Sequence, residues 1–238
     1  MSNPLLSEVS SSGVPPLTDQ LLVLPVGAME AHGPHLPLGS DLLQAEATAK
    51  DLARRVRCVV APGIPYGVCP GTRGFPGTVS ISPGTLARLT EDLTEGFYRT
   101  GFRKFLILSG HGAAAHMAAL REGVGTVVSR HPEVRAAVLC DYEFVYELRG
   151  KDAPATDGHA GLLETSRVMA LAPEQVGPAR PSVEYRVHRS VVGDPSREDW
   201  PDSVMGDTRG ASAETGRRIH AHVMDRLVET VATIFGGA

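Results

Sequence analysis

The segment GAMEAHGPHLPLGSD, which runs from Gly27 to Asp41, carries side chains that are typical ligands of metal ions. Glu30 and His32 are two residues apart, and alternate side chains of an extended chain point to the same side. A carboxylate and an imidazole would therefore face one point, and His35 follows in the same segment. This spacing predicts a metal-binding loop. The alternative is a solvated surface loop in which Asp41 caps the next helix, because one such pair is a weak signal.

Two later segments offer further ligands or acid–base groups. His111 stands in SGHG, directly after an apolar run, and His159 and Glu164 stand in DGHAGLLETS. Residues five apart lie about 140° apart around a regular helix, so His159 and Glu164 face one target only if His159 precedes the first turn. In the alternative interpretation His111 is a structural loop histidine, Asp157 is a helix cap and Glu164 pairs with Arg167 at the surface.

Alternating strands and helices would bring these segments together. Short apolar runs predict strands, and segments rich in helix formers predict helices. The strands are expected at residues 21–26, 58–61, 104–108 and 134–139, and the helices at 42–55, 86–99, after Gly112 to about Val128, and from Leu162 onward. This order predicts an α/β domain in which a parallel sheet carries helices on both faces. Ligands of such sheets bind at the carboxyl edge, where the segments of Glu30 and His111 would both lie.

The composition is that of a globular protein, and the alternation of strands and helices predicts one continuous domain. The 238 residues are 42% hydrophobic and 21% charged, with a net charge of −4 and no basic stripe that would indicate nucleic-acid binding. No apolar run approaches the roughly 20 residues of a membrane span. Residues 1–18 are expected to form a flexible lead-in and residues 19–238 the domain. The three cysteines, Cys58, Cys69 and Cys140, are an odd number at wide spacing, which predicts reduced thiols and a cytoplasmic location.

Four motifs together resemble a known family. Taken in order, GAMEAHGPHLPLGSD, FPGTVSI, SGHG and DGHAGLLETS are similar to successive signatures of the creatininase family, also called creatinine amidohydrolases, and GDTRGASAETGRR extends the resemblance to roughly residues 20–225. The resemblance implies a three-layer α/β/α domain with a mostly parallel sheet, two divalent metal ions (zinc, manganese or iron in different members) and commonly a homohexamer. It also implies hydrolysis of a C–N bond in a non-peptide or unusual amide.

Carried over residue by residue, the resemblance implies one metal ion held by Glu30 and His111 and a second held by His32. Asp41 would bridge the two ions, and His159 would be the acid–base residue. Creatinine-hydrolysing members also have a metal-binding glutamate two residues after the histidine that matches His111. This glutamate is absent here.

The sequence departs from those members in further ways. Ala113 occupies the position of the absent glutamate, and Glu164 could fill the vacant coordination. The tryptophans that those enzymes set against creatinine near the histidine matching His159 are also absent, since the chain has only Trp200, well downstream. We therefore expect a substrate other than creatinine.

The long loop at residues 64–85 is rich in proline and glycine, and such a stiff, long loop within a compact domain is typically functional. Thr72 and Arg73 stand here where many relatives carry Glu-His. The planar guanidinium of Arg73 suits a carboxylate or phosphate of the substrate. An ordinary solvated arginine is the alternative.

The chemistry follows from the charges. Glu30, Asp41 and Glu164 would repel one another in a cleft unless cations compensate them. Water that bridges two divalent cations loses its proton near neutral pH, and His159 could pass a proton to the departing nitrogen. These residues predict a metal-dependent amidohydrolase that cleaves a small cyclic or non-peptide amide through a metal-bridging hydroxide. The alternatives are peptidase-like processing of a modified peptide and a non-catalytic metal-binding member of the family.

Overall fold

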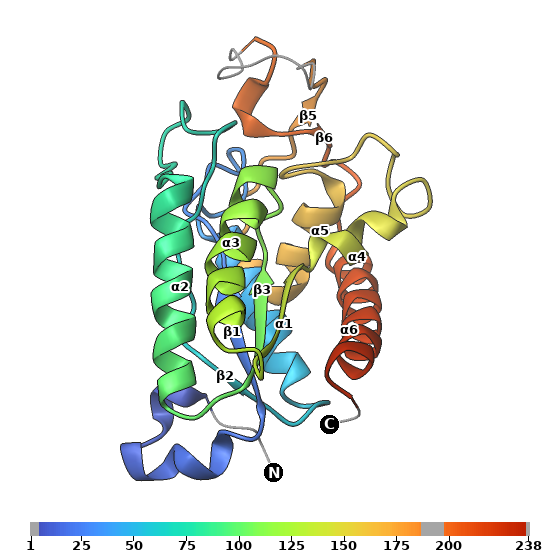
Figure 1. Ribbon diagram of the computed structural model, residues 1–238. Helices are drawn as coiled ribbons and strands as arrows, with labels where there is room; N and C mark the ends of the chain where they lie inside the picture. Colours follow the sequence, from blue (N-terminus) through green and yellow to red (C-terminus); the bar gives the residue numbers. More distant parts are fainter. Residues whose placement is uncertain (1–4, 187–197, 237–238) are drawn as a thin grey trace.

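A parallel sheet forms the centre of the molecule in the computed structural model, which describes residues 5–186 and 198–236 (Figure 1). Its four strands have the order β2-β1-β3-β4. They are β1 (Leu21–Val26), β2 (Cys58–Val60), β3 (Lys104–Ser109) and β4 (Arg135–Cys140). All of β1 and all but the first residue of β3 are buried, as expected for a parallel sheet that is covered on both faces. The predicted mostly parallel sheet is confirmed.

Helices cover the sheet on both sides and complete three layers (Figure 1). Helices α2 (Pro83–Arg99) and α3 (Ala114–Arg130) pack against each other on one face. Helices α1 (Ser40–Leu52), α5 (Leu162–Leu171) and α6 (Ala213–Phe235) pack together on the other. The short α4 (Tyr142–Val145) follows β4. In the described part of the chain, no helix is long and apolar enough to cross a membrane.

The last helix, α6, was not predicted. Its N-cap is Ser212, whose hydroxyl accepts a hydrogen bond from the Thr215 backbone. Residues Ile219, Val223, Leu227 and Val231 recur at every fourth position and are buried, which gives the helix one apolar face. This face covers the sheet on the side of α1 and α5.

Short elements fill the ends of the chain and the upper loops. Strands β5 (Ser182–Val183) and β6 (Gly206–Asp207) form a separate antiparallel pair. The 3₁₀ helices are Leu6–Glu8, Ser11–Gly13, Pro15–Leu17, Tyr146–Leu148, Pro173–Gln175 and Pro201–Ser203. The first three lie in the predicted lead-in, where Leu5, Leu6, Val14 and Leu17 pack against the core. The flexibility expected for residues 1–18 stays a prediction.

A buried ion pair fastens α5 to the end of β4. The Arg167 guanidinium donates to the Asp141 carboxylate at 2.7 Å, and neither side chain is exposed to solvent. Arg167 also donates to the hydroxyl of Thr48 on α1. These contacts fix the position of α5 relative to α1. Both helices carry candidate site residues. The alternative interpretation, an exposed Glu164 paired with Arg167, is wrong because Glu164 is buried and its carboxylate lies 3.4 Å from His32.

The first turn of α1 lies directly against the loops that follow β1 and β3. A Cβ atom at Gly110 would lie 2.1 Å from the carbonyl oxygen of Asp41, and one at Gly27 would lie 2.3 Å from the nitrogen of Leu42. Only glycine allows so close an approach at these two positions. The approach brings Asp41 to the carboxyl edge of the sheet.

Candidate metal centre

The carboxyl edge of the sheet gathers the five residues that the sequence analysis predicted as metal ligands. Glu30 and His32 follow β1, Asp41 lies in the first turn of α1, His111 follows β3 and Glu164 lies in the first turn of α5. All five are buried. Segments that are far apart in sequence thus converge on one cluster, as the parallel topology predicted.

Asp41 lies between the two histidines of the cluster. Its Oδ1 is 3.1 Å from Nε2 of His32, and its Oδ2 is 3.1 Å from Nδ1 of His111. Glu30 Oε2 approaches the same His111 nitrogen at 3.0 Å, and Glu164 Oε1 approaches the His32 nitrogen at 3.4 Å. The donors therefore form two groups that share one carboxylate, an arrangement suited to two neighbouring cations. Asp41 caps no hydrogen-bond donor of α1 with its side chain, contrary to the alternative interpretation.

Two carboxylate oxygens in the cluster are buried without a hydrogen-bond partner among the described residues. They are Oε2 of Glu30 and Oδ2 of Asp41, and both face the His111 ring. The other oxygen of Glu30 accepts a hydrogen bond from the Thr72 hydroxyl. Buried charge without compensation is costly, so the two free oxygens and the imidazole between them fit a bound cation.

Backbone carbonyls fix the orientation of all three histidines at the cluster. His32 donates from Nδ1 to the Glu30 carbonyl at 2.9 Å, and His111 donates from Nε2 to the Val68 carbonyl at 3.0 Å. His159 donates from Nε2 to the Ala31 carbonyl at 2.8 Å. Since a carbonyl can only accept, the second nitrogen of each ring is left unprotonated in the neutral form and faces the carboxylates. Histidines that bind metals are commonly oriented in this way.

The electrostatics of the metal-free cluster indicate which charges it favours. Burial alone would lower the pKa of His32, but the carboxylates of Asp41 and Glu164 raise it well above its ordinary value. Likewise Glu30 and Asp41 raise the pKa of His111 against the effect of burial. Burial would raise the pKa of Glu30, yet the nearby His111 and His159 hold it well below its usual range. The cluster thus attracts positive charge, which protons supply here and divalent cations would supply more fully.

Glu164 is held in place by its neighbours. Its Oε2 accepts a hydrogen bond from the Ala160 backbone at 2.7 Å, and its Oε1 accepts one from Gln44 at 3.0 Å. Tyr142 in turn donates to the Gln44 amide oxygen. Ala160 has a left-handed backbone with φ of 52°, and α5 begins only at Leu162. His159 therefore precedes the first turn, which is the condition for it and Glu164 to face one target.

His159 lies at the rim of the cluster. Its Nδ1 is 4.0 Å from Glu30 Oε2, and its ring lies 4.3 Å from that of His32. The Trp200 ring meets the His159 ring edge-to-face, with 5.6 Å between the ring centroids. A tryptophan therefore does stand against this histidine, although it comes from a distant part of the chain. The absence of a tryptophan near His159 in the sequence is therefore no argument against creatinine. A substrate other than creatinine stays a prediction.

A cavity of about 310 Å³ opens onto the cluster. Glu30, Asp41, His111, His159 and Glu164 line its floor, and its walls include Tyr142, Tyr146, Arg149, Tyr185 and Trp200. This volume lies at the lower end of the range for small-molecule sites. The aromatic walls and the charged floor suit a small molecule with a polar group that meets the cluster.

The structure does not bring Arg73 to this cavity. Arg73 is exposed and lines a neighbouring cavity with Val68, Pro70 and Val79. Its role in substrate binding stays a prediction. Arg149 lines the cavity over the cluster instead, and nothing in its sequence context distinguished it.

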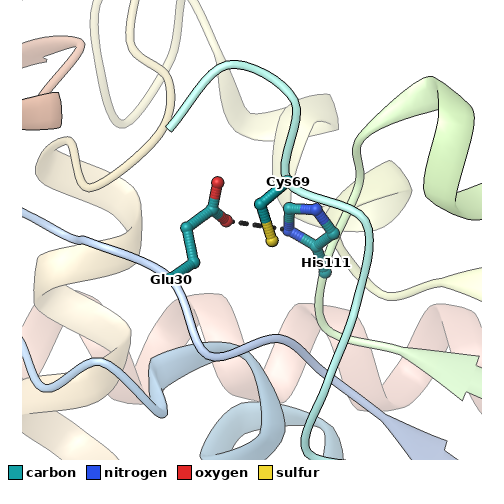
Figure 2. A group of neighbouring side chains, drawn as sticks. All are labelled: Glu30, Cys69 and His111. Atoms are coloured by element: carbon teal, nitrogen blue, oxygen red, sulfur yellow. Dashed lines mark ion pairs between the residues drawn. The ribbon is translucent and has the colours of Figure 1, made fainter. Parts of the chain in front are cut away.

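Cys69 and Thr72 are further residues that the sequence analysis did not assign to the site. Both lie in the long loop at residues 64–85, and both are fully buried beside Glu30. Figure 2 shows the side chains of Glu30, Cys69 and His111 pointing toward one another. The proline and glycine content of the loop was the one available signal that it reaches a functional site.

Known proteins resemble the chain over nearly its whole length. The sequence model of the creatininase family, described as creatinine amidohydrolase, matches residues 9–231. The chain is 30% identical to the mycofactocin precursor peptide peptidase of Mycobacterium tuberculosis (strain CDC 1551 / Oshkosh), over 96% of this chain and 92% of that protein. It is 28% identical to the creatinine amidohydrolase of Pseudomonas putida, over 84% of each.

Solved structures share the fold. A creatinine amidohydrolase (creatininase) matches with a TM-score of 0.88 at 23% identity, over 100% of both chains. A creatininase variant of the Zn-Zn type has a TM-score of 0.87 at 23% identity, over 98% of each chain. A structure named creatininase Mn has a TM-score of 0.86 at 24% identity, over 97% of this chain and 98% of that one. The names of the last two structures refer to zinc and to manganese.

Proposed function

This chain belongs to the creatininase family, whose members are hydrolases of amide bonds, and we propose that it is a metal-dependent amidohydrolase that cleaves a C–N bond of a small amide. The observation that carries the proposal is the shared buried cluster, in which Asp41 offers one oxygen to each of two histidines. In the proposed assignment His111, Glu30 and Asp41 hold one divalent ion, and His32, Asp41 and Glu164 hold the second. Zinc, manganese and iron are the candidates.

The bound ions would supply an activated water and would polarise the substrate carbonyl. The other steps belong to the protein. The Ala31 carbonyl holds the proton of His159 on Nε2, so the lone pair of Nδ1 faces the cavity floor. There His159 can accept a proton from the attacking water and return it to the departing nitrogen. The nitrogen must be protonated, because an amide anion is a very poor leaving group.

The orientation of Glu164 supports its assignment to the second ion. Its Oε1 faces His32 at 3.4 Å while hydrogen bonds from Ala160 and Gln44 hold the carboxylate. Ala113 lines the cavity but offers no ligand atom. Glu164 can therefore compensate for the carboxylate that position 113 lacks.

A second candidate function is the processing of a short peptide. Arg149 lies in the cavity wall beside three tyrosines and Trp200, a set that suits the end of a peptide better than a compact uncharged ring. The mycofactocin precursor peptide peptidase is among the relatives with similar sequence. A non-catalytic metal-binding role is disfavoured, because a purely structural site needs no open cavity and no proton shuttle.

A substrate panel tests the proposal. Purified protein is stripped of metal, reloaded with zinc, manganese or iron, and offered lactams, formamides and short peptides while amine release is measured. We expect hydrolysis of at least one class, dependent on added metal. The variant His159→Ala should keep its metal content and lose at least ~10²-fold in turnover. Metal-loaded protein that hydrolyses no panel member, or an active His159→Ala variant, would contradict the mechanism. The expected homohexamer and cytoplasmic location remain predictions.

A further inference from the structure

Cys69 lies against the half of the cluster formed by Glu30 and His111. One ligand atom of each of these three residues lies within 4.8 Å of the other two (Figure 2). Cys69 is fully buried and does not line the cavity, so its thiol approaches the cluster from the protein side. The free Oε2 of Glu30, which has no hydrogen-bond partner among the described residues, faces the same space. A buried carboxylate oxygen, an imidazole and a thiol together form a typical ligand set for a transition metal.

The backbone around Cys69 is held on both sides. The Val68 nitrogen donates to Nδ1 of His116 at 3.2 Å, and the Val68 carbonyl accepts from His111 at 3.0 Å. The Cys69 nitrogen donates to the Ser80 hydroxyl at 2.9 Å. The same loop that orients His111 therefore positions the thiol. Ligands that are held in this way bind a metal without a large cost of ordering.

We propose that Cys69 binds, as a thiolate, the metal ion held by Glu30 and His111. The inference rests on the proposed metal centre. On binding, a metal–sulfur bond forms and the S–H bond breaks, and the proton leaves to solvent. The thiolate occupies the inner side of the ion and leaves the side facing the cavity open to substrate. Since thiolate is a soft ligand, this half of the site should prefer zinc or iron over manganese.

The other two cysteines provide the comparison. Cys58 and Cys140 are also buried, and neither belongs to a group of potential ligands among the described residues. Cys140 is the closer match, because its sulfur lies 3.4 Å from where a Cβ atom at Gly112 would stand, one residue from His111. Cys140 therefore tests whether any buried thiol near His111 binds the metal ion, or only one placed as Cys69 is.

Cobalt(II) substitution tests the inference without any substrate. Metal-free protein is loaded with cobalt, and its near-ultraviolet absorption is recorded, where a thiolate bound to cobalt gives a charge-transfer band. We expect the band in the wild type and in Cys140→Ser, and its loss in Cys69→Ser. When zinc and manganese compete for the metal-free protein, the ratio of bound zinc to bound manganese should be at least about tenfold lower in Cys69→Ser than in the wild type. Changes to residues around a metal site typically alter metal affinity by this much.

Several outcomes would overturn the inference. They are a wild-type cobalt protein without the band, a band that persists in Cys69→Ser, and a zinc preference that this substitution leaves unchanged. The wild-type spectrum is decisive even if Cys69→Ser fails to fold. These measurements need no turnover, so an absent band with intact hydrolysis would refute the thiolate ligand and leave the proposed function standing.

Arg149 carries a second inference, from an independent observation. Its guanidinium lies 3.4 Å over the ring of Tyr146, and both residues line the cavity above the cluster. Its Nε is buried without a hydrogen-bond partner among the described residues. The nearby carboxylate of Asp157 is already engaged by the backbone nitrogens of Leu162 and Leu163 at the start of α5. Burial raises the pKa of Asp157 and the charge of Arg149 lowers it. Among the described residues, however, no carboxylate forms an ion pair with Arg149, so its guanidinium is available to a ligand in the cavity.

We infer that the substrate of the proposed hydrolase carries a carboxylate that Arg149 binds. Stacking on Tyr146 holds the guanidinium plane in place, and a fixed guanidinium binds a carboxylate with two parallel hydrogen bonds. The cluster on the cavity floor would then act on an amide elsewhere in the same molecule. A free peptide C-terminus and an N-acyl amino acid share this chemistry.

Paired probes test the assignment, each an N-formyl amino acid or dipeptide and its uncharged C-terminal amide. We measure hydrolysis, and calorimetric binding to the metal-loaded protein, which does not depend on turnover. We expect the acid to be preferred by about tenfold or more, the range of a charged hydrogen bond. Arg149→Gln should abolish the preference. Arg73→Gln tests the competing assignment and should keep the preference, because Arg149 and not Arg73 lines the cavity over the cluster. No binding preference in the wild type, or its loss in Arg73→Gln alone, would refute the assignment.

Discussion

Replacing Gly110 by alanine should move Asp41 and thereby weaken metal binding. The new Cβ atom would lie 2.1 Å from the Asp41 carbonyl oxygen, whereas ordinary contact begins at 3.4 Å. The backbones at residues 110 and 41 must therefore separate by about 1.3 Å. The nearest atoms all belong to the Asp41 backbone, so no flexible side chain can move aside instead. Asp41 is the residue that the proposal places between the two ions, so a shift of its backbone changes both halves of the cluster.

The expected magnitudes follow from that displacement. A misplacement of about 1 Å in a reacting site costs on the order of 10²-fold in turnover, and overpacking costs about 1–3 kcal/mol of stability. Metal per chain is measured by elemental analysis after dialysis, with circular dichroism as the control for folding. Gly112→Ala is the matched control in the same loop, because its nearest neighbour is the Cys140 sulfur at 3.4 Å. Folded Gly110→Ala protein with a full complement of two metals and normal turnover would refute the reasoning.

Three further predictions concern the same region. Glu164→Ala should reduce the metal content from two ions to about one, and full occupancy by elemental analysis would remove Glu164 from the ligand set. Arg167→Met should lower the free energy of unfolding, measured in urea, by about 3–5 kcal/mol, because it leaves the buried Asp141 carboxylate unpaired. The double variant Arg167→Met with Asp141→Leu should recover most of this loss. A double variant as unstable as the single one would contradict this explanation. In the metal-free protein, Glu30 and Glu164 have pKa values below the ordinary 4.5, so their contribution to stability is lost as the pH falls below that value. His32 and His111 have raised pKa values, so their contribution is complete below the ordinary 6.5 and is lost as the pH rises through the folded-state values. Without metal the melting temperature should therefore fall as the pH rises above 6.5, and zinc should move this fall to higher pH because it binds the neutral histidines; a metal-free melting temperature that rises above pH 6.5 would show that the His32 and His111 shifts have the wrong sign.

Much of the fold could be predicted because its strands are short, uninterrupted apolar runs. The bounds of β1 at residues 21–26 agree with the prediction, and the other three strands of the central sheet differ by one residue at one or both ends. The two-residue strands β5 and β6 were not predicted. Buried parallel strands have this pattern because both faces meet helices. The convergence of Glu30 and His111 then follows from topology alone. By contrast, α6 was not predicted although its apolar positions recur regularly, because the motif GDTRGASAETGRR covers only the start of this helix.

Residues that reach the site across a long loop could not be placed from the sequence. Trp200 is distant from His159 along the chain, yet their rings are in contact, and Arg149 lines the cavity while Arg73 does not. In strands and helices, sequence spacing determines which side a residue faces, whereas in an irregular loop it does not. The proline and glycine content of residues 64–85 marks the loop as functional without indicating that Cys69 rather than Arg73 points toward the cluster.

The partners that orient the histidines escape sequence analysis for a different reason. The carbonyls that fix His32, His111 and His159 belong to Glu30, Val68 and Ala31, and a carbonyl is present whatever the side chain. A motif therefore records the ligands but not the groups that decide which ring nitrogen is free. Two of these carbonyls lie in the segment that also supplies Glu30, so the backbone path of that segment sets both the ligands and their protonation. This dependence on backbone position is why a single added methyl at Gly110 should affect the centre more than many side-chain changes around it.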